Sequence, residues 1–513
     1  MTSAEKPLVQ SPDLEEHLRT DDLMDNLGQR TARGGAITIF SQGSKFILSM
    51  VGTVILARLL LPEDYGLVGM VAVVTGFIAI FKDLGLSAAT IQKAEVSNDQ
   101  ISTLFWLNVA LSVGIMLLTA ALAPAVAWFY GQPALTGVTL AYAAGFLLGG
   151  LTVQHEALLR RRMRFAALAT AEIVSLVVSI TVAIVLARRG ARYWALVLSQ
   201  LALGLTYLIA IWIACRWRPG LPVRNSGVRS MLAFGGNLTA FGVVNYFARN
   251  LDNMLIGRFW GAGQLGLYAR AYQLLLLPVD QINAPITAVA VPALSRLNDS
   301  PERYRRAYLR LVEKVALLTM PAMAFMISSS EQLVGLLLGQ KWLGVSRIFA
   351  LLGISGLVQP IANTTGWLFV TQGRTNDMFK WGILGSSLMV AAIIAGLAWG
   401  AVGVALSYSL TVTILIVPLL LWYVTRTGPV RMTDFYVTLA PIFIAALGSL
   451  LIVLVLKSWL PVHNLVASLA LNLTVTIATT LGILVLLPRG RRALSDVKHS
   501  TFFLFRKPIV RDL

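Results

Sequence analysis

The sequence is poor in charge, in cysteine and in histidine, and each shortage excludes a class of protein. Only 13% of its 513 residues are charged, against about 25% in soluble domains, so the composition is that of a membrane protein. The single cysteine, Cys215, rules out a disulfide framework and a cysteine-based metal cluster. The four histidines form no His/Asp/Glu cluster with ligand spacing, so no metal site is predicted.

Two sequence motifs are also missing. The sequence has no Gly-Lys-Ser/Thr phosphate-binding loop, which argues against direct ATP hydrolysis. No basic start followed by a short apolar run is present, so residues 1–33 are predicted to be a polar cytosolic tail instead of a signal peptide. We predict no catalytic residues and no cofactor. The net charge of +18 is explained by basic loops at a membrane better than by nucleic-acid binding.

Long apolar runs dominate the chain, since 57% of the residues are hydrophobic. A bilayer core about 30 Å thick requires roughly 20 apolar residues in a helix. Runs of that kind predict an all-α polytopic membrane protein with about fourteen spans. The predicted spans are 34–58, 65–82, 102–125, 135–156, 167–187, 193–214, 231–257, 265–290, 311–329, 345–370, 378–398, 401–424, 434–456 and 464–487.

Basic residues lie mostly on one side of these spans. Both tails and the loops after even-numbered spans hold 31 of the 42 lysines and arginines, and the opposite loops hold 8. Because cytoplasmic loops carry the excess of positive charge, both termini are predicted to be cytoplasmic.

An internal repeat at a spacing of 200 residues predicts two lobes. The segment 55–67 matches 255–267 without gaps, pairing Arg58 with Arg258 and Gly66 with Gly266. Six spans in each copy give both the same topology, as in parallel-repeat transporters. The predicted organisation is two pseudo-symmetric six-helix lobes around a central cavity (34–229 and 230–430), two additional helices (431–488) and a basic cytoplasmic tail (489–513).

Polar stripes occur at the same offset in both copies. Lys45, Ser49 and Thr53 share one helix face in the first, and Asn245, Arg249 and Asn253 occupy the equivalent positions in the second. Lys45 lies about 18 Å along its helix, where a charge usually faces water or a pathway. The residues predicted to line a substrate cavity are Lys45, Ser49, Asn245, Arg249, Asp252, Asn253 and Arg270, and those with an ion-coupling role are Asp280 and Glu172.

Each assignment has a structural alternative. Lys45 is also compatible with a structural ion pair, and Arg249 with a local pair to Asp252 three residues on. Arg270 is equally compatible with snorkelling to the interface, and Glu172 with a position near the cytosol. A cavity lined by lysine and arginine favours an anionic ligand, and arginine matches phosphate geometry, so a pyrophosphate-linked sugar fits.

Four further motifs stand out in the sequence: Ile55–Leu67, the segment from Asp252 to Tyr272, Glu156–Phe165 and Pro292–Leu297. They resemble motifs of bacterial polysaccharide transporters, which belong to the multidrug, oligosaccharidyl-lipid and polysaccharide exporter superfamily. The resemblance, over about residues 30–430, implies alternating access in a bacterial cytoplasmic membrane. It also implies export of undecaprenyl-pyrophosphate-linked repeat units for exopolysaccharide, capsule or O-antigen, with a polysaccharide polymerase and a chain-length regulator as partners besides membrane lipids.

Three other functions stay open. A lipid II flippase of the same superfamily would also use cationic cavity residues, whereas a multidrug/cation antiporter would require acidic ones. A membrane-embedded polymerase, ligase or acyltransferase is disfavoured, because the sequence offers neither a large outer loop nor a histidine at mid-span. The expectation is therefore a flippase and not an enzyme.

Overall fold

The computed structural model describes residues 27–81, 90, 96–223, 229–460, 462 and 464–505, and every regular element in these ranges is helical. For parts of the long helix α10 (Arg229–Ser295), only the path of the backbone is described. Eleven described segments are long and apolar enough to cross a membrane. One of them, Thr375–Thr425, turns back at Gly400. The long helix α10, which is not among the eleven, breaks at Gly261.

The chain divides into two compact units, Met1–Leu265 and Gly266–Leu513, called here the N-terminal and C-terminal units. The sequence placed the division near residue 230 instead. The difference arises because the first half of α10 packs on the N-terminal unit. The predicted central cavity, which would lie between the lobes, stays a prediction. Besides that half of α10, the N-terminal unit holds α2 (Leu27–Leu59), α3 (Pro62–Ala79), α5 (Asn98–Tyr130), α6 (Ala134–Gly150), α7 (Val153–Arg161), α8 (Phe165–Arg188) and α9 (Tyr193–Ala214).

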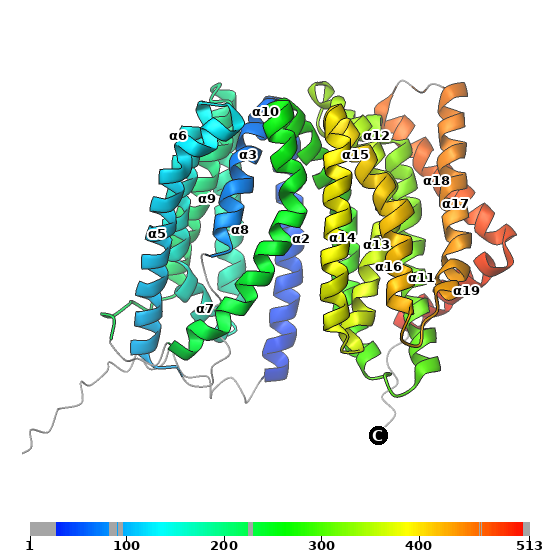
Figure 1. The fold of residues 1–513 in the computed structure, drawn as a ribbon, viewed down its shortest axis with the longest axis horizontal. Coiled ribbons are helices and arrows are strands. Elements are labelled where there is room, and N and C mark those ends of the chain that lie inside the picture. Colours follow the sequence, from blue (N-terminus) through cyan, green and yellow to red (C-terminus); the bar gives the residue numbers. More distant parts are fainter. Residues whose placement is uncertain are drawn as a thin grey trace, which may run out of the picture. The chain divides into compact units, whose positions relative to one another are not determined.

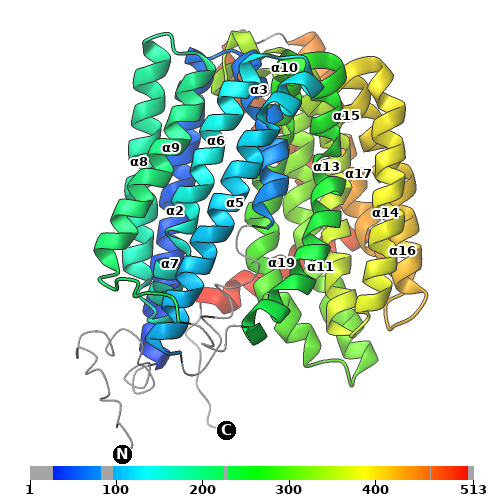
Figure 2. The ribbon, with the colours of Figure 1, turned by 60° about the vertical axis from the view of Figure 1, so that its left-hand side comes forward.

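The helices of the N-terminal unit run alongside one another, and α8 packs on both α2 and α9 (Figures 1 and 2). Their outward faces are apolar: Ile213 on α9 is 71% exposed and Leu117 on α5 is 60% exposed. Such surface is unfavourable in water but matches a lipid environment, where the helical hydrogen bonds satisfy the backbone. The exposed apolar faces therefore agree with the membrane assignment.

The C-terminal unit contains the second half of α10 and the remaining elements. These are α11 (Pro301–Ser328), α12 (Ser330–Leu337), η2 (Gln340–Trp342), α13 (Gly344–Thr371), α14 (Thr375–Gly396), η3 (Leu397–Trp399), α15 (Gly400–Leu410), η4 (Thr411–Ile416), α16 (Val417–Thr425), α17 (Met432–Trp459), α18 (Leu465–Leu486) and α19 (Pro488–Phe505). The hairpin between α14 and α15 requires glycine on both arms, because a Cβ on Gly396 would lie 2.5 Å from the carbonyl oxygen of Gly403.

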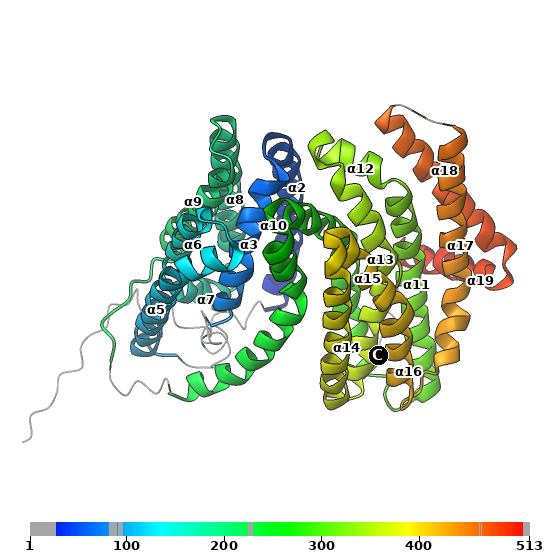
Figure 3. The same cartoon turned by 45° about the horizontal axis from the view of Figure 1, so that its top comes forward.

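The described parts of the two predicted tails are helical. Helix α2 begins at Leu27, so residues 27–33 are helical instead of forming part of the predicted tail, and residues 1–26 lie outside the described residues. The predicted basic tail begins as helix α19, which contacts α17 and α18 (Figure 3). Ala493 of α19 is buried. The start of this tail is therefore packed against the C-terminal unit.

The two copies of the internal repeat touch each other in the N-terminal unit. A Cβ on Gly66 of α3 would lie only 1.7 Å from the carbonyl oxygen of Ala262, which follows the break in α10 at Gly261. Farther along the same two helices, the Tyr246 hydroxyl donates to the carbonyl of Val73 at 2.8 Å. The ring centroids of Phe77 and Phe247 lie 4.9 Å apart. Close backbone approach at Gly66 thus fixes α10 against α3.

We predict that Gly66→Ala destabilises the protein, because the added methyl group must displace a backbone carbonyl. Overpacking of this kind typically costs about 1–3 kcal/mol. Gly69→Ala is the matched control, since its Cβ would meet a Leu265 side chain at an ordinary 3.5 Å. Thermal unfolding in detergent should show a lower Tm for Gly66→Ala alone. Equal melting of both variants would contradict the close contact.

Candidate functional site

The centre of the candidate site is an ion pair inside the N-terminal unit. The Lys45 ammonium on α2 lies 2.5 Å from the Glu172 carboxylate on α8, and the two side chains are 24% and 30% exposed. Both helices are long and apolar enough to cross a membrane. An unpaired charge at such a depth costs about 2.5 kcal/mol or more, so each residue supplies the counter-charge that the other needs.

Helix packing explains why these two side chains meet. A Cβ on Gly34 would meet Phe165 at 2.6 Å, and a Cβ on Gly52 would meet Ile180 at 3.0 Å, so both glycines face α8. Lys45 lies seven residues before Gly52 and eleven after Gly34, spacings that put it on the same helix face. The predicted polar stripe is therefore split: Lys45 faces α8, whereas Ser49 is exposed and Thr53 is half-buried.

Further polar and charged side chains lie next to the Lys45–Glu172 pair. The Tyr207 hydroxyl on α9 lies near the Glu156 carboxylate and interacts electrostatically with Glu172. Glu156 in turn accepts hydrogen bonds from Arg160 at 2.7 and 2.9 Å. We call these five residues the charge chain; it connects the middle of α2 to the arginine-rich loop after α7. Sequence reasoning did not find Tyr207, because nothing in the sequence connects it to a partner. For Glu156 and Arg160, the i,i+4 spacing on one helix is a signal that indicates their pairing.

Two buried polar side chains of the N-terminal unit, His155 and Asn108, are not part of the charge chain. His155 is fully buried, stacked on Trp212 at 4.4 Å and edge-on to Trp217 at 5.1 Å. Asn108 on α5 is also fully buried, and its side-chain atoms have no hydrogen-bond partner among the described residues. Buried groups of this kind usually bind water or another small polar partner.

The second predicted stripe lies on the first half of α10. Arg249 is exposed, whereas Asp252 is buried and accepts a hydrogen bond from the Asn253 amide at 2.7 Å. The side chain of Asn245 lies outside the described residues. Because this half of α10 belongs to the N-terminal unit, Arg249 and Lys45 are part of one compact unit, and not of two separate lobes.

Two predicted residues lie on the second half of α10, in the C-terminal unit. The Arg270 guanidinium donates to the Gln273 side chain, which is a local contact three residues along the helix. The side chain of Asp280 lies outside the described residues. The structure thus brings Lys45 and Glu172 together within the N-terminal unit, whereas Arg270 belongs to the C-terminal unit.

The chain matches the model of a family described as "Polysaccharide biosynthesis protein" over residues 55–347. The chain belongs to this family. Among its relatives, the lipopolysaccharide biosynthesis protein WzxC of Escherichia coli is 27% identical over 83% of this chain and 84% of its own length. The succinoglycan biosynthesis transport protein ExoT of Rhizobium meliloti is 23% identical over 70% and 73%.

Solved structures show the fold of this family member. The lipid II flippase MurJ superposes with a TM-score of 0.70 over 88% of this chain and 98% of that protein, at 16% identity. A multidrug resistance MATE transporter superposes with a TM-score of 0.56 over 74% and 94%, also at 16% identity. The resemblance to the polysaccharide-transporter family and the polytopic helical fold are therefore confirmed. The protein is a membrane transporter of polysaccharide biosynthesis and not an enzyme.

We predict that the stability effects of Lys45 and Glu172 are coupled. Lys45→Met leaves Glu172 uncompensated and should cost about 1–3 kcal/mol, the usual effect of orphaning a buried polar group. Lys45→Met combined with Glu172→Leu removes both charges and should recover most of that loss. Tryptophan-monitored thermal unfolding gives the comparison, with exposed Ser49→Ala as the neutral control. If the double variant melts below the single one, the pair is not coupled as described.

Proposed function

We propose that this transporter moves a lipid-linked anionic oligosaccharide across the bacterial cytoplasmic membrane by alternating access. The observation that carries the proposal is the Lys45–Glu172 pair: it is intramembrane, yet about a quarter exposed. Membership of a polysaccharide biosynthesis family, with relatives named as biosynthesis and transport proteins, supports the substrate class. Undecaprenyl pyrophosphate is the proposed carrier, because its pyrophosphate supplies the negative charge for Lys45 and its undecaprenyl chain supplies the lipid tail.

In the proposed cycle, the pyrophosphate replaces Glu172 as the partner of Lys45. A divalent anion attracts the ammonium more strongly than one carboxylate does in the same dielectric. When the substrate leaves, Glu172 pairs with Lys45 again, so the empty site never holds a bare cation. The displaced Glu172 requires a proton or another cation at that depth. This requirement provides a route for ion coupling along the charge chain. Arg249 is proposed as a second cation for the substrate.

The same pair bears on the alternative functions. A multidrug/cation antiporter would need an acidic group free to bind its cationic substrate, whereas Glu172 is neutralised by Lys45. A lipid II flippase would share the anion chemistry, and the identity of the sugar distinguishes the two. We propose a polysaccharide repeat unit because the family model is described as a polysaccharide biosynthesis protein, and because the relatives WzxC and ExoT are named for lipopolysaccharide and succinoglycan biosynthesis. A polymerase and a chain-length regulator are the expected partners.

We predict that flux depends on the cation at residue 45. The Lys45→Met/Glu172→Leu variant should fold but lose transport of a labelled undecaprenyl-pyrophosphate oligosaccharide in proteoliposomes. The charge swap Lys45→Glu/Glu172→Lys restores the pair but moves the cation to α8, so flux should fall well below wild type. Arg249→Ala should also lose flux, whereas Arg347→Ala, an exposed arginine of the C-terminal unit, should not. Normal flux in the charge-free variant would refute the proposed role.

We also predict the orientation of the chain, with both termini cytoplasmic. Burial raises the pKa of the Cys215 thiol, which suppresses its reactive thiolate and leaves a low labelling background. In this background, Arg189→Cys in the loop after α8 should react with an impermeant maleimide in intact spheroplasts. Asp299→Cys in the loop after α10 should react only after the membrane is opened. Both residues are exposed, so the reverse pattern would overturn the orientation.

A further inference from the structure

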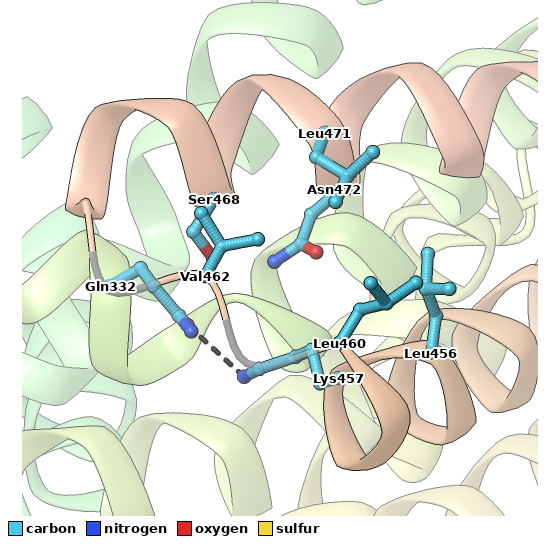
Figure 4. Close-up of a pocket in the computed structure, with 8 residues that line it drawn as sticks. All are labelled: Gln332, Leu456, Lys457, Leu460, Val462, Ser468, Leu471 and Asn472. Atoms are coloured by element: carbon cyan, nitrogen blue, oxygen red, sulfur yellow. Dashed lines mark hydrogen bonds between the residues drawn. The ribbon is translucent and has the colours of Figure 1, made fainter.

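A second cationic site lies in the C-terminal unit, apart from the charge chain. A cavity of about 180 Å³ opens between α12, α17 and α18, at the end where α17 stops and α18 begins. Its lining combines polar Gln332, Lys457 and Asn472 with apolar residues of the α17–α18 connection (Figure 4). Ligand pockets for drug-sized molecules measure about 300–1,000 Å³. This cavity therefore suits one headgroup and not an oligosaccharide.

Lys457 is the only cation lining this cavity among the residues that the structure describes. Its ammonium donates to the carbonyl oxygen of Ser328 at 2.9 Å and to the Gln332 side-chain oxygen at 3.1 Å. An ammonium group carries three N–H donors, so one stays available for a further acceptor. The two fixed acceptors hold the charge in place, and the third donor can meet an anion.

The wall of the cavity that α18 supplies carries buried polar side chains. Asn472 of α18 is 1% exposed, and its amide donates to the Ser329 hydroxyl at 3.0 Å, at the junction of α11 and α12. Ser468, one turn earlier on α18, is also buried and lines the same cavity. The cavity is thus built between fixed polar groups, which lowers the ordering cost of a bound ligand.

The mouth of the cavity lies at the level expected for lipid headgroups. Trp459 and Leu460, at the end of α17, are 81% and 59% exposed. Tryptophan and lysine at the end of a membrane helix mark the boundary between hydrocarbon and water. A molecule entering here therefore meets apolar side chains at the mouth and a cation inside, which matches the two parts of a phospholipid.

We propose that this cavity binds the phosphate of a zwitterionic phospholipid headgroup, with Lys457 as its cation. Glu331, on the first turn of α12, is exposed and lies near enough to interact with Lys457. This carboxylate attracts the amine of phosphoethanolamine and disfavours a headgroup with a net negative charge. The bound lipid connects α12, α17 and α18, and it is a different ligand from the transported substrate.

Lipid titrations of the purified full-length protein test the site. Phosphatidylethanolamine added to delipidated protein should raise the Tm in a saturable manner, and native mass spectrometry should show one retained lipid. Charge-assisted hydrogen bonds contribute about 1.5–3 kcal/mol, so Lys457→Met should raise the half-saturating lipid concentration by at least about tenfold. Lys341→Met is the matched control, because Lys341 is exposed and does not line the cavity.

Each comparison has an outcome that overturns the proposal. Every variant is measured against its own lipid-free Tm, so a general loss of stability in Lys457→Met does not hide the result. Equal stabilisation by diacylglycerol would show that the phosphate is not recognised. Saturation by inorganic phosphate at the same concentration would overturn the lipid assignment, and stronger binding of phosphatidylglycerol would overturn the zwitterionic headgroup. An unchanged lipid response in Lys457→Met would refute the role of this residue.

Discussion

The ion pair between Lys45 and Glu172 brings a lysine and a carboxylate together at a depth where neither is stable alone. This requirement for internal charge compensation explains the local design of the N-terminal unit. Small residues of α2 face α8, which lets the two helices approach until the charges meet. Tyr207, Glu156 and Arg160 then continue the polar path toward a basic loop. A compensated charge that stays partly exposed can exchange partners, and exchange is what a transporter of anions needs.

The lysine at the second cationic site, Lys457, also has polar partners that compensate its charge. Lys457 is held by a carbonyl and an amide oxygen instead of a carboxylate, and Glu331 is an exposed neighbour and not a direct partner. Lys45 therefore has a counter-ion that an incoming anion must displace, whereas Lys457 keeps a donor for an additional ligand. The first arrangement suits a substrate that binds and leaves, and the second suits a lipid that stays. The difference lies in the partner of each lysine and not in the lysine itself.

The two copies of the internal repeat contact each other in the structure. They meet where Gly66 of α3 approaches Ala262, directly after the break in α10 at Gly261. The N-terminal unit ends at Leu265, so the part of α10 from Gly266 onward belongs to the C-terminal unit. The break in α10 is therefore held on α3 within the N-terminal unit.

The length of the apolar runs in the sequence predicted the helices, because a membrane-spanning helix is determined by about 20 consecutive residues. The family motifs, such as Ile55–Leu67, likewise predicted the transporter family. The sequence also marked Lys45 and Glu172 individually, as charges within apolar runs. Their pairing required the tertiary structure, since 127 residues separate them and only the packing of α2 on α8 brings them together. Tyr207 and Lys457 were missed for the same reason: their partners come from other helices, and long-range contacts leave no periodic signal in the sequence.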